Sequence, residues 1–593
     1  LRNFRKMFNM PVGKEEVMPY DLYTEENVSK KYVDLDICLK YVSKIEVDNA
    51  EKIFIDNCNK WSCFDELKKV NILEYSKRYC EIDVEVLKTG YLSFQKDIKK
   101  ICDLNIVNYC SMASLGYDSL IKSGCLEGCY KLSGVPREFL QKFVVGGKCM
   151  TRDNKKWIYE GTYNEDKKEW TDYLEDFDGV SLYPSALYRM KGFIKGKPKV
   201  IPNFINDPDK LIKYDQFFVK VKCINNTDKP LSFPLLSNYA NGIRNFSNDT
   251  KDNIYYLDKI LYEECKEHLD LKFTIICCYY FNEGFNTKIN DFILHLFNKR
   301  LEEKKNKNPI EKVYKLLMNS CYGKTLLKPI EEETKTISID KWDKEYSRYY
   351  NFIKEYTFNE KGGYVIYKKI KTITEQFNNV HQGVYVLSTS KRIMNEVMVT
   401  AERNNCTIFY TDTDSIHIRG TDIEKLRKIY NNKYCSKERL IKYPEEKIFR
   451  QNDLIGKFLG QFHSDFDSKK LERNLEDGEH IKSCYAVFLG KKCYLDKLFS
   501  YDRKNNKIDY DYHLRMKGVS KDAIKYYKEE NNIDYDEIYN KLFKIEHKEN
   551  GLNFDLLCGG KKCSFKYNSD LSIRTESSFH RKLFFPYEEG ILV

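Results

Sequence analysis

The sequence predicts an α+β protein of several domains, because helical and strand-rich segments occupy separate blocks of the chain. Its 593 residues exceed the size at which a single hydrophobic core usually suffices. Hydrophobic residues make up 42% of the chain and charged residues 32%, which provides both core material and a polar surface. Apolar residues recur at helical spacing within 288–324, whereas they alternate as in a strand at 217–221.

The N-terminal part begins with mixed short elements and then becomes helical. We expect a helix over residues 70–99 and further helical structure within 101–150, where Gly146-Gly147 marks a break. After Asp178 the pattern changes, and strands dominate.

Residues 288–324 predict a helical hairpin followed by a second strand-rich segment. Asn308 is the expected cap of the second helix, with Pro309 at its first position. Beyond the hairpin, residues 361–363 predict a turn between two β-rich runs, and residues 382–404 predict a further helix.

Two acids lie two residues apart in the segment 410–418. Side chains alternate along a strand, so Asp412 and Asp414 are expected to point to the same side. Two like charges there raise the free energy unless a cation neutralises them. Mg²⁺ is suited to this because it takes hard oxygen ligands and leaves room for substrate phosphates. Taken alone, such a pair is also common in solvated turns.

A third acid lies upstream, in residues 176–185. There a strand is expected to end at Asp178, turn at Gly179 and stop at Pro184. Asp176 lies one strand period earlier and is a competing candidate by position alone.

Basic and polar residues recur on the predicted hairpin. Lys315, Asn319 and Tyr322 lie at i, i+4 and i+7 and so are expected on one helix face. Arg300 and Lys304 form an i, i+4 basic pair on the facing helix, although solvated helix charges would look the same.

These three segments together indicate nucleotidyl transfer. Breaking a triphosphate needs two metals held by separate carboxylates, one lowering the pKa of the attacking hydroxyl and one clamping the leaving pyrophosphate. Cations on a helix would neutralise the phosphates, and flat tyrosine rings would contact a sugar and a base.

The same segments resemble the polymerase motifs of family B DNA polymerases, in the family's order. The family's Asp-x-x-Ser-Leu-Tyr-Pro matches Asp178 to Pro184, its Lys-x-x-x-Asn-Ser-x-Tyr-Gly matches Lys315 to Gly323, and its Asp-Thr-Asp-Ser matches Asp412 to Ser415. The family fold is a right hand of palm, fingers and thumb. The Ser-Leu-Tyr-Pro match aligns Asp178, and not Asp176, with the family's acid.

The resemblance implies a role for each matched residue. The implied metal ligands are Asp178, Asp414 and the Gly179 carbonyl, with Asp412 as the flanking catalytic acid. The implied nucleotide-binding residues are Tyr183, which excludes a 2′-hydroxyl, and Arg300, Lys304, Lys315, Asn319 and Tyr322. The implied primer-template contacts are Gly146, Gly147, Lys492 and Tyr494. Two Mg²⁺ ions, replaceable by Mn²⁺, are the implied cofactors.

Alternatives remain open where motifs are short. Val144 stands where the family's linker has an aromatic residue, and Gly146-Gly147 alone would also fit a simple turn. Tyr183 alone would fit a core tyrosine, and Lys492 and Tyr494 would fit structural roles.

The resemblance also implies a division of the chain. We expect the C-terminal remnant of an RNase H-like 3′–5′ exonuclease domain in 1–100, a linker and the start of the palm in 101–177, the palm with a first insertion in 178–287, the fingers in 288–326, the palm with a second insertion in 327–470, and the thumb in 471–593.

Exonuclease activity is not expected. Tyr79 and Asp83 resemble the third exonuclease motif, but residues 1–78 contain neither of the two earlier motifs. One acid cannot hold the metals of such a site, so the chain is expected to begin inside the exonuclease domain.

The expected function is template-directed DNA synthesis, using dNTPs and a primer-template. Two insertions in these positions resemble protein-primed members of the family, so a terminal priming protein is an expected partner, as in linear viral, plasmid or mobile-element genomes. The first alternative is a catalytically silent remnant that still binds DNA. A second alternative, an RNA-synthesising or reverse-transcribing enzyme, is disfavoured by Tyr183.

Bulk composition agrees with this expectation without proving it. The net charge of +11 is compatible with a polyanionic partner. The 20 cysteines are scattered, which favours reduced thiols in an intracellular compartment. No run of roughly 20 apolar residues predicts a membrane span.

Overall fold

The fold was analysed in a computed structural model. It describes residues 5, 17–43, 45, 47, 49–167, 169–201, 207–240, 243–442, 453–467, 481–502, 507–517, 519, 521–544, 554–558, 561–567 and 573–577. These residues form two compact units: unit 1 comprises Leu1–Gly124 and Asp291–Lys324, and unit 2 comprises Cys125–Asn290 and Thr325–Val593. Most of residues 1–16, where the expected exonuclease remnant starts, lies outside the described residues.

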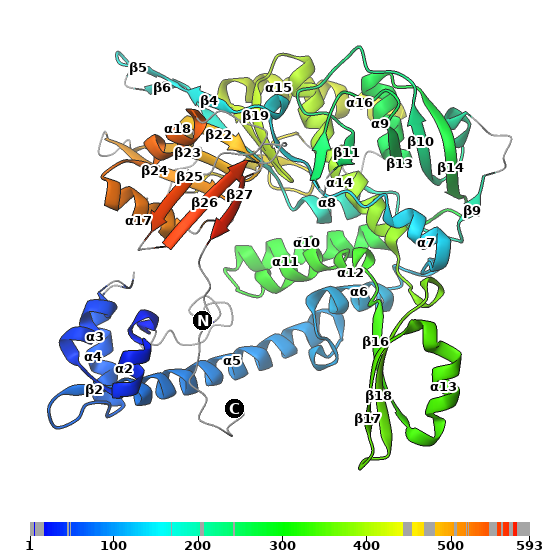
Figure 1. The fold of residues 1–593 in the computed structure, drawn as a ribbon. Helices are drawn as coiled ribbons and strands as arrows, with labels where there is room; N and C mark the ends of the chain where they lie inside the picture. Colours follow the sequence, from blue (N-terminus) through cyan, green and yellow to red (C-terminus); the bar gives the residue numbers. More distant parts are fainter. Residues whose placement is uncertain are drawn as a thin grey trace. The chain divides into compact units, whose positions relative to one another are not determined.

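Unit 1 starts with a small helical subdomain and continues into one long helix (Figure 1). The subdomain contains α2 (Glu25–Lys30), α3 (Leu35–Val42) and α4 (Ala50–Lys60), with β1 (Tyr32–Asp34) paired to β2 (Lys69–Asn71). Helix α5 (Ile72–Cys102) begins where the Asn71 side chain accepts a hydrogen bond of 3.1 Å from Glu74 N. The helix predicted over 70–99 is therefore confirmed.

The predicted helical hairpin is present, with one local correction. Helix α10 (Lys288–Lys305), which starts in unit 2, is followed by α11 (Glu311–Ser320) and α12 (Gly323–Leu326). Asn308 does not cap α11, because its side chain accepts from Ile310 N at 3.2 Å in a local turn. The helix consequently begins two residues after Pro309. Helix α6 (Met112–Lys122) packs on the end of α11, where a Cβ on Gly116 would lie 3.0 Å from the Ser320 backbone.

Unit 2 is built on a nine-stranded sheet of order β24-β23-β22-β7-β20-β19-β3, with β21 on β7 and β4 on β22. The strands are β3 (Cys149–Thr151), β4 (Trp157–Glu160), β7 (Leu174–Gly179), β19 (Ile408–Asp412), β20 (Ser415–Arg419), β21 (Phe462–Ser464), β22 (Lys482–Gly490), β23 (Cys493–Asp502) and β24 (Lys507–Met516). Strands β22–β24 fall in the segment expected as thumb, yet they share this sheet with β7. Helices α17 (Lys521–Asn531) and α18 (Tyr535–Lys544) follow them.

Two further sheets lie between the motif-bearing segments of the chain. The first has the order β13-β10-β14-β9 and the second β16-β18-β17. Their strands are β9 (Lys199–Val200), β10 (Gln216–Cys223), β13 (Ile254–Asp258), β14 (Phe273–Phe281), β16 (Glu332–Ser338), β17 (Ile353–Asn359) and β18 (Tyr364–Ile370). The predicted strand at 217–221 and the predicted turn at 361–363 are both confirmed.

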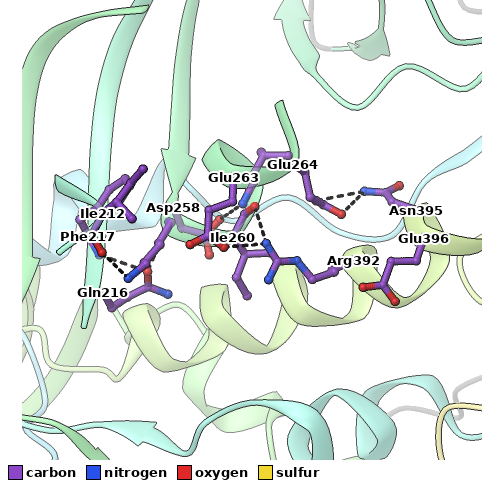
Figure 2. Close-up of polar contacts among 12 residues, drawn as sticks. Ile212, Gln216, Phe217, Asp258, Ile260, Glu263, Glu264, Arg392, Asn395 and Glu396 are labelled. Carbon is purple, nitrogen blue, oxygen red and sulfur yellow. Dashed lines mark hydrogen bonds and ion pairs between the residues drawn. The ribbon is translucent and has the colours of Figure 1, made fainter. Parts of the chain in front are cut away.

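Helix α14 (Val380–Arg403) confirms the helix predicted over 382–404 and is buried along most of its length. It shares a buried polar layer with α9 (Lys259–Leu269), shown in Figure 2. Arg392 donates to Glu263 at 2.9 Å, and Asn395 lies 3.3 Å from both carboxylate oxygens of Glu264. These contacts join α9, which follows β13 of the first inserted sheet, to α14. Among the described helices, none has the length and apolarity to span a membrane.

Candidate active site

Asp178 and Asp414 meet at one end of the central sheet. Asp178 is the penultimate residue of β7, and it pairs with Ser415, the first residue of β20. The Gly179 N–H donates a hydrogen bond of 2.7 Å to the carbonyl of Asp414. Two acids 236 positions apart in the chain are thereby held on neighbouring strand ends.

The turn between the two acids of the Asp-Thr-Asp motif differs from the expectation. Strand β19 ends at Asp412, and Thr413 has a φ of +65°, in the left-handed region. Asp412 and Asp414 therefore lie on either side of a tight hairpin turn, and strand alternation does not relate their side chains. The strand-alternation argument for placing both side chains on one side therefore does not apply across this turn, and their shared orientation stays a prediction.

Asp412 is paired with a lysine from the adjacent β22–β23 turn. Lys492 Nζ lies 2.8 Å from both Oδ1 and Oδ2 of Asp412. The Lys492 backbone N–H donates to the buried Tyr410 hydroxyl at 2.9 Å, which fixes the turn that carries it. Lys492 thus neutralises Asp412, whereas the described residues show no ion pair to the Asp414 side chain.

Gly147 packs directly against this turn. A Cβ at Gly147 would lie 2.7 Å from Thr413 Cγ2, whereas a Cβ at Gly146 would meet nothing within 4 Å. Thr413 N also donates to the Lys148 carbonyl at 2.8 Å. The Gly-Gly segment therefore supports the turn between the acids, and only its second glycine needs to lack a side chain.

The electrostatics of the acids fit a divalent cation. Burial raises the pKa of Asp414, and the Asp412 charge raises it further, while Lys492 opposes both. A carboxylate in this position is stabilised by a bound cation, and carboxylate and carbonyl oxygens are the donors that Mg²⁺ prefers. No group of three His, Cys, Asp or Glu side chains among the described residues could hold a metal alone. A metal at Asp178 and Asp414 would accordingly also use the Gly179 carbonyl or substrate oxygens.

Tyr183 lies in the first turn of α8 (Leu182–Arg189), which follows β7 and its candidate metal ligand Asp178. The prediction that the segment stops at Pro184 was wrong. Pro184 instead lies in the first turn of α8, where backbone N–H groups have no partner within the helix and proline is tolerated. In the connection Ser181 adopts a φ of +47°, and Ser185 Oγ donates a hydrogen bond of 2.7 Å to the Val180 carbonyl.

A buried cluster of one histidine and two acids was not predicted. His417 Nε2 lies 3.1 Å from Asp496, and His417 Nδ1 lies 3.8 Å from Asp176. Burial favours neutral His417, but the two carboxylates outweigh burial and raise its pKa. Burial raises the pKa of Asp176 to about 6, against the opposing effect of His417. The only signal in the sequence was that Asp176 lies two residues before Asp178 and His417 two residues after Ser415, as on one face of a strand.

Tyr494, which the resemblance places near the primer, is only 5% exposed. Its ring lies 4.8 Å from that of Tyr410 and packs in a cluster with Phe488. Burial raises its pKa strongly. In this arrangement Tyr494 supports the turn that carries Lys492, and offers little surface to a strand of DNA.

The expected nucleotide-binding residues of the hairpin lie in unit 1. Lys315 and Asn319 are both exposed on α11, as their spacing predicts, and Lys304 is exposed on α10. Tyr322 lies in the turn beyond the end of α11, so it does not continue that face. Arg300 Nε lies 3.2 Å from Glu311 in a mostly buried ion pair that joins α10 to α11. Lys304 and Lys315 are therefore more accessible to phosphates than Arg300.

Tyr79 and Asp83 lie one turn apart on α5. Burial raises the pKa of Asp83, and the described residues around it supply no metal-holding group. Cys125 and Cys129 are free thiols.

Comparison with known proteins agrees with the motifs. Residues 1–404 match the family described as DNA polymerase type B, organellar and viral. A probable DNA polymerase of Neurospora intermedia is 26% identical over 439 residues, covering 72% of this chain and 41% of the relative. A DNA polymerase of Kluyveromyces lactis is 23% identical over 449 residues, covering 73% of this chain and 41% of the relative. The chain thus spans less than half the length of both relatives.

Among solved structures, Phi29 DNA polymerase complexed with primer-template DNA and incoming nucleotides superimposes with a TM-score of 0.51. At 16% identity the match covers 86% of this chain and 72% of that chain, and it shows a common fold. The chain belongs to the type B DNA polymerases of the organellar and viral kind. The family resemblance and the α+β right-hand fold predicted from the sequence are confirmed. The domain boundaries and site residues stay predictions.

Proposed function

We propose that this chain is a DNA-directed DNA polymerase, adding deoxynucleotides from dNTPs to a 3′-hydroxyl opposite a template. The observation that carries the proposal is the hydrogen bond of 2.7 Å from Gly179 N to the Asp414 carbonyl, which joins the strand ends bearing the two candidate metal ligands. The family and the names of the relatives support the same activity.

In this proposal, Asp178, Asp414 and the Gly179 carbonyl hold the two Mg²⁺ ions, for which Mn²⁺ can substitute. The ions supply Lewis-acid chemistry, lowering the pKa of the primer hydroxyl and neutralising the leaving pyrophosphate. Lys492 holds Asp412 in place beside them. Lys304 and Lys315 offset the triphosphate charge, and Tyr183 lies beneath the sugar, where a 2′-hydroxyl would collide.

The purified chain should extend a labelled primer on a template with dNTPs and Mg²⁺. Asp414→Asn should abolish extension while leaving primer-template binding intact. Binding without extension by the unchanged chain would instead favour a silent DNA-binding remnant. Incorporation of rNTPs as efficiently as dNTPs would contradict the role of Tyr183.

We further propose that a terminal protein primes synthesis. The sheets β9–β14 and β16–β18 lie between the motif-bearing segments, where protein-primed members of the family carry insertions. A terminal protein supplied with the chain and radiolabelled dNTP should become covalently labelled. Labelling of DNA primers alone would restrict the proposal to DNA-primed synthesis.

The many free cysteines support a reducing, intracellular site of action.

A further inference from the structure

A cavity of about 580 Å³ lies within unit 2, and none of the candidate catalytic acids is among its described lining residues. Its walls come from the linker after α7 (Gly134–Gln141), the hairpin of β11 (Ser237–Ala240) and β12 (Ile243–Phe246), strand β13, and helix α14. Three lining residues are cationic, namely Lys142, Arg244 and Lys391, and none of the described lining residues is acidic. The cavity therefore favours an anion.

Lys391 is the most distinctive of the three cations. The described residues offer its ammonium group no hydrogen bond and no ion pair, and burial lowers its pKa. Asp258 at the end of β13 and Glu264 on α9 attract the Lys391 ammonium group, while Arg244 repels it. Figure 2 shows that Glu264 is itself bound to Asn395. Lys391 lies on the same helix as Asn395, α14, one turn before it. The charge of Lys391 is thus partly balanced by Asp258 and Glu264, while no acidic residue among the described residues faces it from the cavity.

Arg244 is held in a defined position beside the cavity. Its Nη1 donates to Ser237 Oγ at 3.0 Å, and its Cζ lies 5.6 Å from the Tyr239 ring centre. Burial lowers its pKa, so an anion in the cavity would also restore lost solvation. A guanidinium fixed in this way is suited to two hydrogen bonds with a phosphate.

The remaining wall is aromatic. Tyr239 and Tyr256 both line the cavity, and Lys142 Nζ lies 5.9 Å from the Tyr256 ring centre. Tyr239 is 68% exposed, so one face of its ring is open to a ligand. Flat rings beside cations match a ligand that combines a phosphate with a base. The volume lies within the range of about 300–1,000 Å³ that holds small ligands.

We propose that this cavity is a second binding site for a nucleoside phosphate, with the phosphate on Lys391 and Arg244 and the base on Tyr239. The ligand is either a free nucleotide or one nucleotide of a DNA strand. The site is linked to the catalytic region, because the Arg244 carbonyl accepts a hydrogen bond of 2.9 Å from Lys491, the neighbour of Lys492. The proposal does not depend on polymerase activity.

The test uses the full chain carrying Asp414→Asn, in EDTA, so that nucleotide held by catalytic metals does not contribute. Calorimetric titration with dAMP should show one site. Lys391→Met and Arg244→Gln should each weaken it about tenfold or more. Lys251→Gln, which removes an exposed positive charge outside the cavity, should leave it unchanged. No binding, or equal binding in all variants, overturns the proposal.

Tyr239→Ala guards against a folding artefact, since its ring is largely exposed, and it should weaken dAMP about fivefold. Inorganic phosphate binding as tightly as dAMP would overturn the role of the base. A phosphorylated oligonucleotide that competes better than dAMP identifies a strand nucleotide, and poorer competition identifies a free nucleotide. Primer extension without dAMP binding would refute this site alone, and binding without extension would refute only the proposed function.

Discussion

Lys492 Nζ lies 2.8 Å from both carboxylate oxygens of Asp412, across 80 residues of sequence. This contact makes the two acids of the Asp-Thr-Asp turn unequal. Asp412 has a cationic partner in Lys492, whereas Asp414 is joined through its backbone to the strand end that carries Asp178. This inequality agrees with the proposal that Asp414 binds metal and Asp412 has a supporting role.

Substitution of the three acids should separate these roles. Asp178→Asn and Asp414→Asn should each lower single-turnover primer extension about 1,000-fold or more, because each removes a metal-binding charge. Asp412→Asn should cost only about tenfold, because it weakens the contact with Lys492 but removes no ligand. Thermal melting serves as the folding control. Equal losses for Asp412 and Asp414 would contradict the distinction.

Gly147→Ala should impair catalysis through the turn at Thr413. The new Cβ would lie 2.7 Å from Thr413 Cγ2, so the turn between the acids must shift. A displacement of this kind is expected to reduce the extension rate about tenfold to 100-fold. Gly146→Ala is the matched control, because its Cβ meets nothing within 4 Å and its activity should stay close to that of the unchanged chain. Similar activity of the two variants would refute the contact.

Lys315→Ala should raise the KM for dNTPs about tenfold, because a charge-assisted contact with the triphosphate is lost. Lys312→Ala is the control, since Lys312 is an equally exposed lysine one turn earlier on α11. It should leave the KM nearly unchanged. Steady-state extension with varied dNTP separates KM from kcat, and an equal rise in both variants would indicate a general charge effect.

The buried layer between α9 and α14 should make stability depend on pH. Burial raises the pKa of Glu264 from 4.5 to about 7. Between these pH values the folded chain retains a proton that the unfolded chain has lost, so the free energy of unfolding falls as pH rises from 4.5 to about 7.

Glu264→Gln should remove this part of the pH dependence and still bond to Asn395. Urea unfolding at about pH 4.5 and about pH 8 should show a decline about 3 kcal/mol smaller in the variant than in the unchanged chain. Glu267→Gln, a more exposed acid on the same helix, is the control. Parallel pH profiles for Glu264→Gln and the unchanged chain would show that Glu264 ionises normally in the folded state.

Local patterns in the sequence predicted several of the helices and turns. The helices over 70–99 and 382–404 and the turn at 361–363 were predicted because periodicity and glycine act within a few residues. Two local predictions failed because a single residue type is compatible with more than one local structure. Asn308 forms a turn instead of a helix cap, and Pro184 enters a helix that it was expected to prevent.

By itself the sequence determined the family, the α+β class and the acids that belong together, because these depend on residue type, order and spacing. Only the tertiary structure decided how the acids are used. Strand register placed Ser415 beside Asp178, a left-handed Thr413 formed the turn between Asp412 and Asp414, and a turn distant in sequence brought Lys492 to Asp412. Such contacts depend on which strands pair and in which register, and long-range pairing of this kind leaves no periodic signal in the sequence.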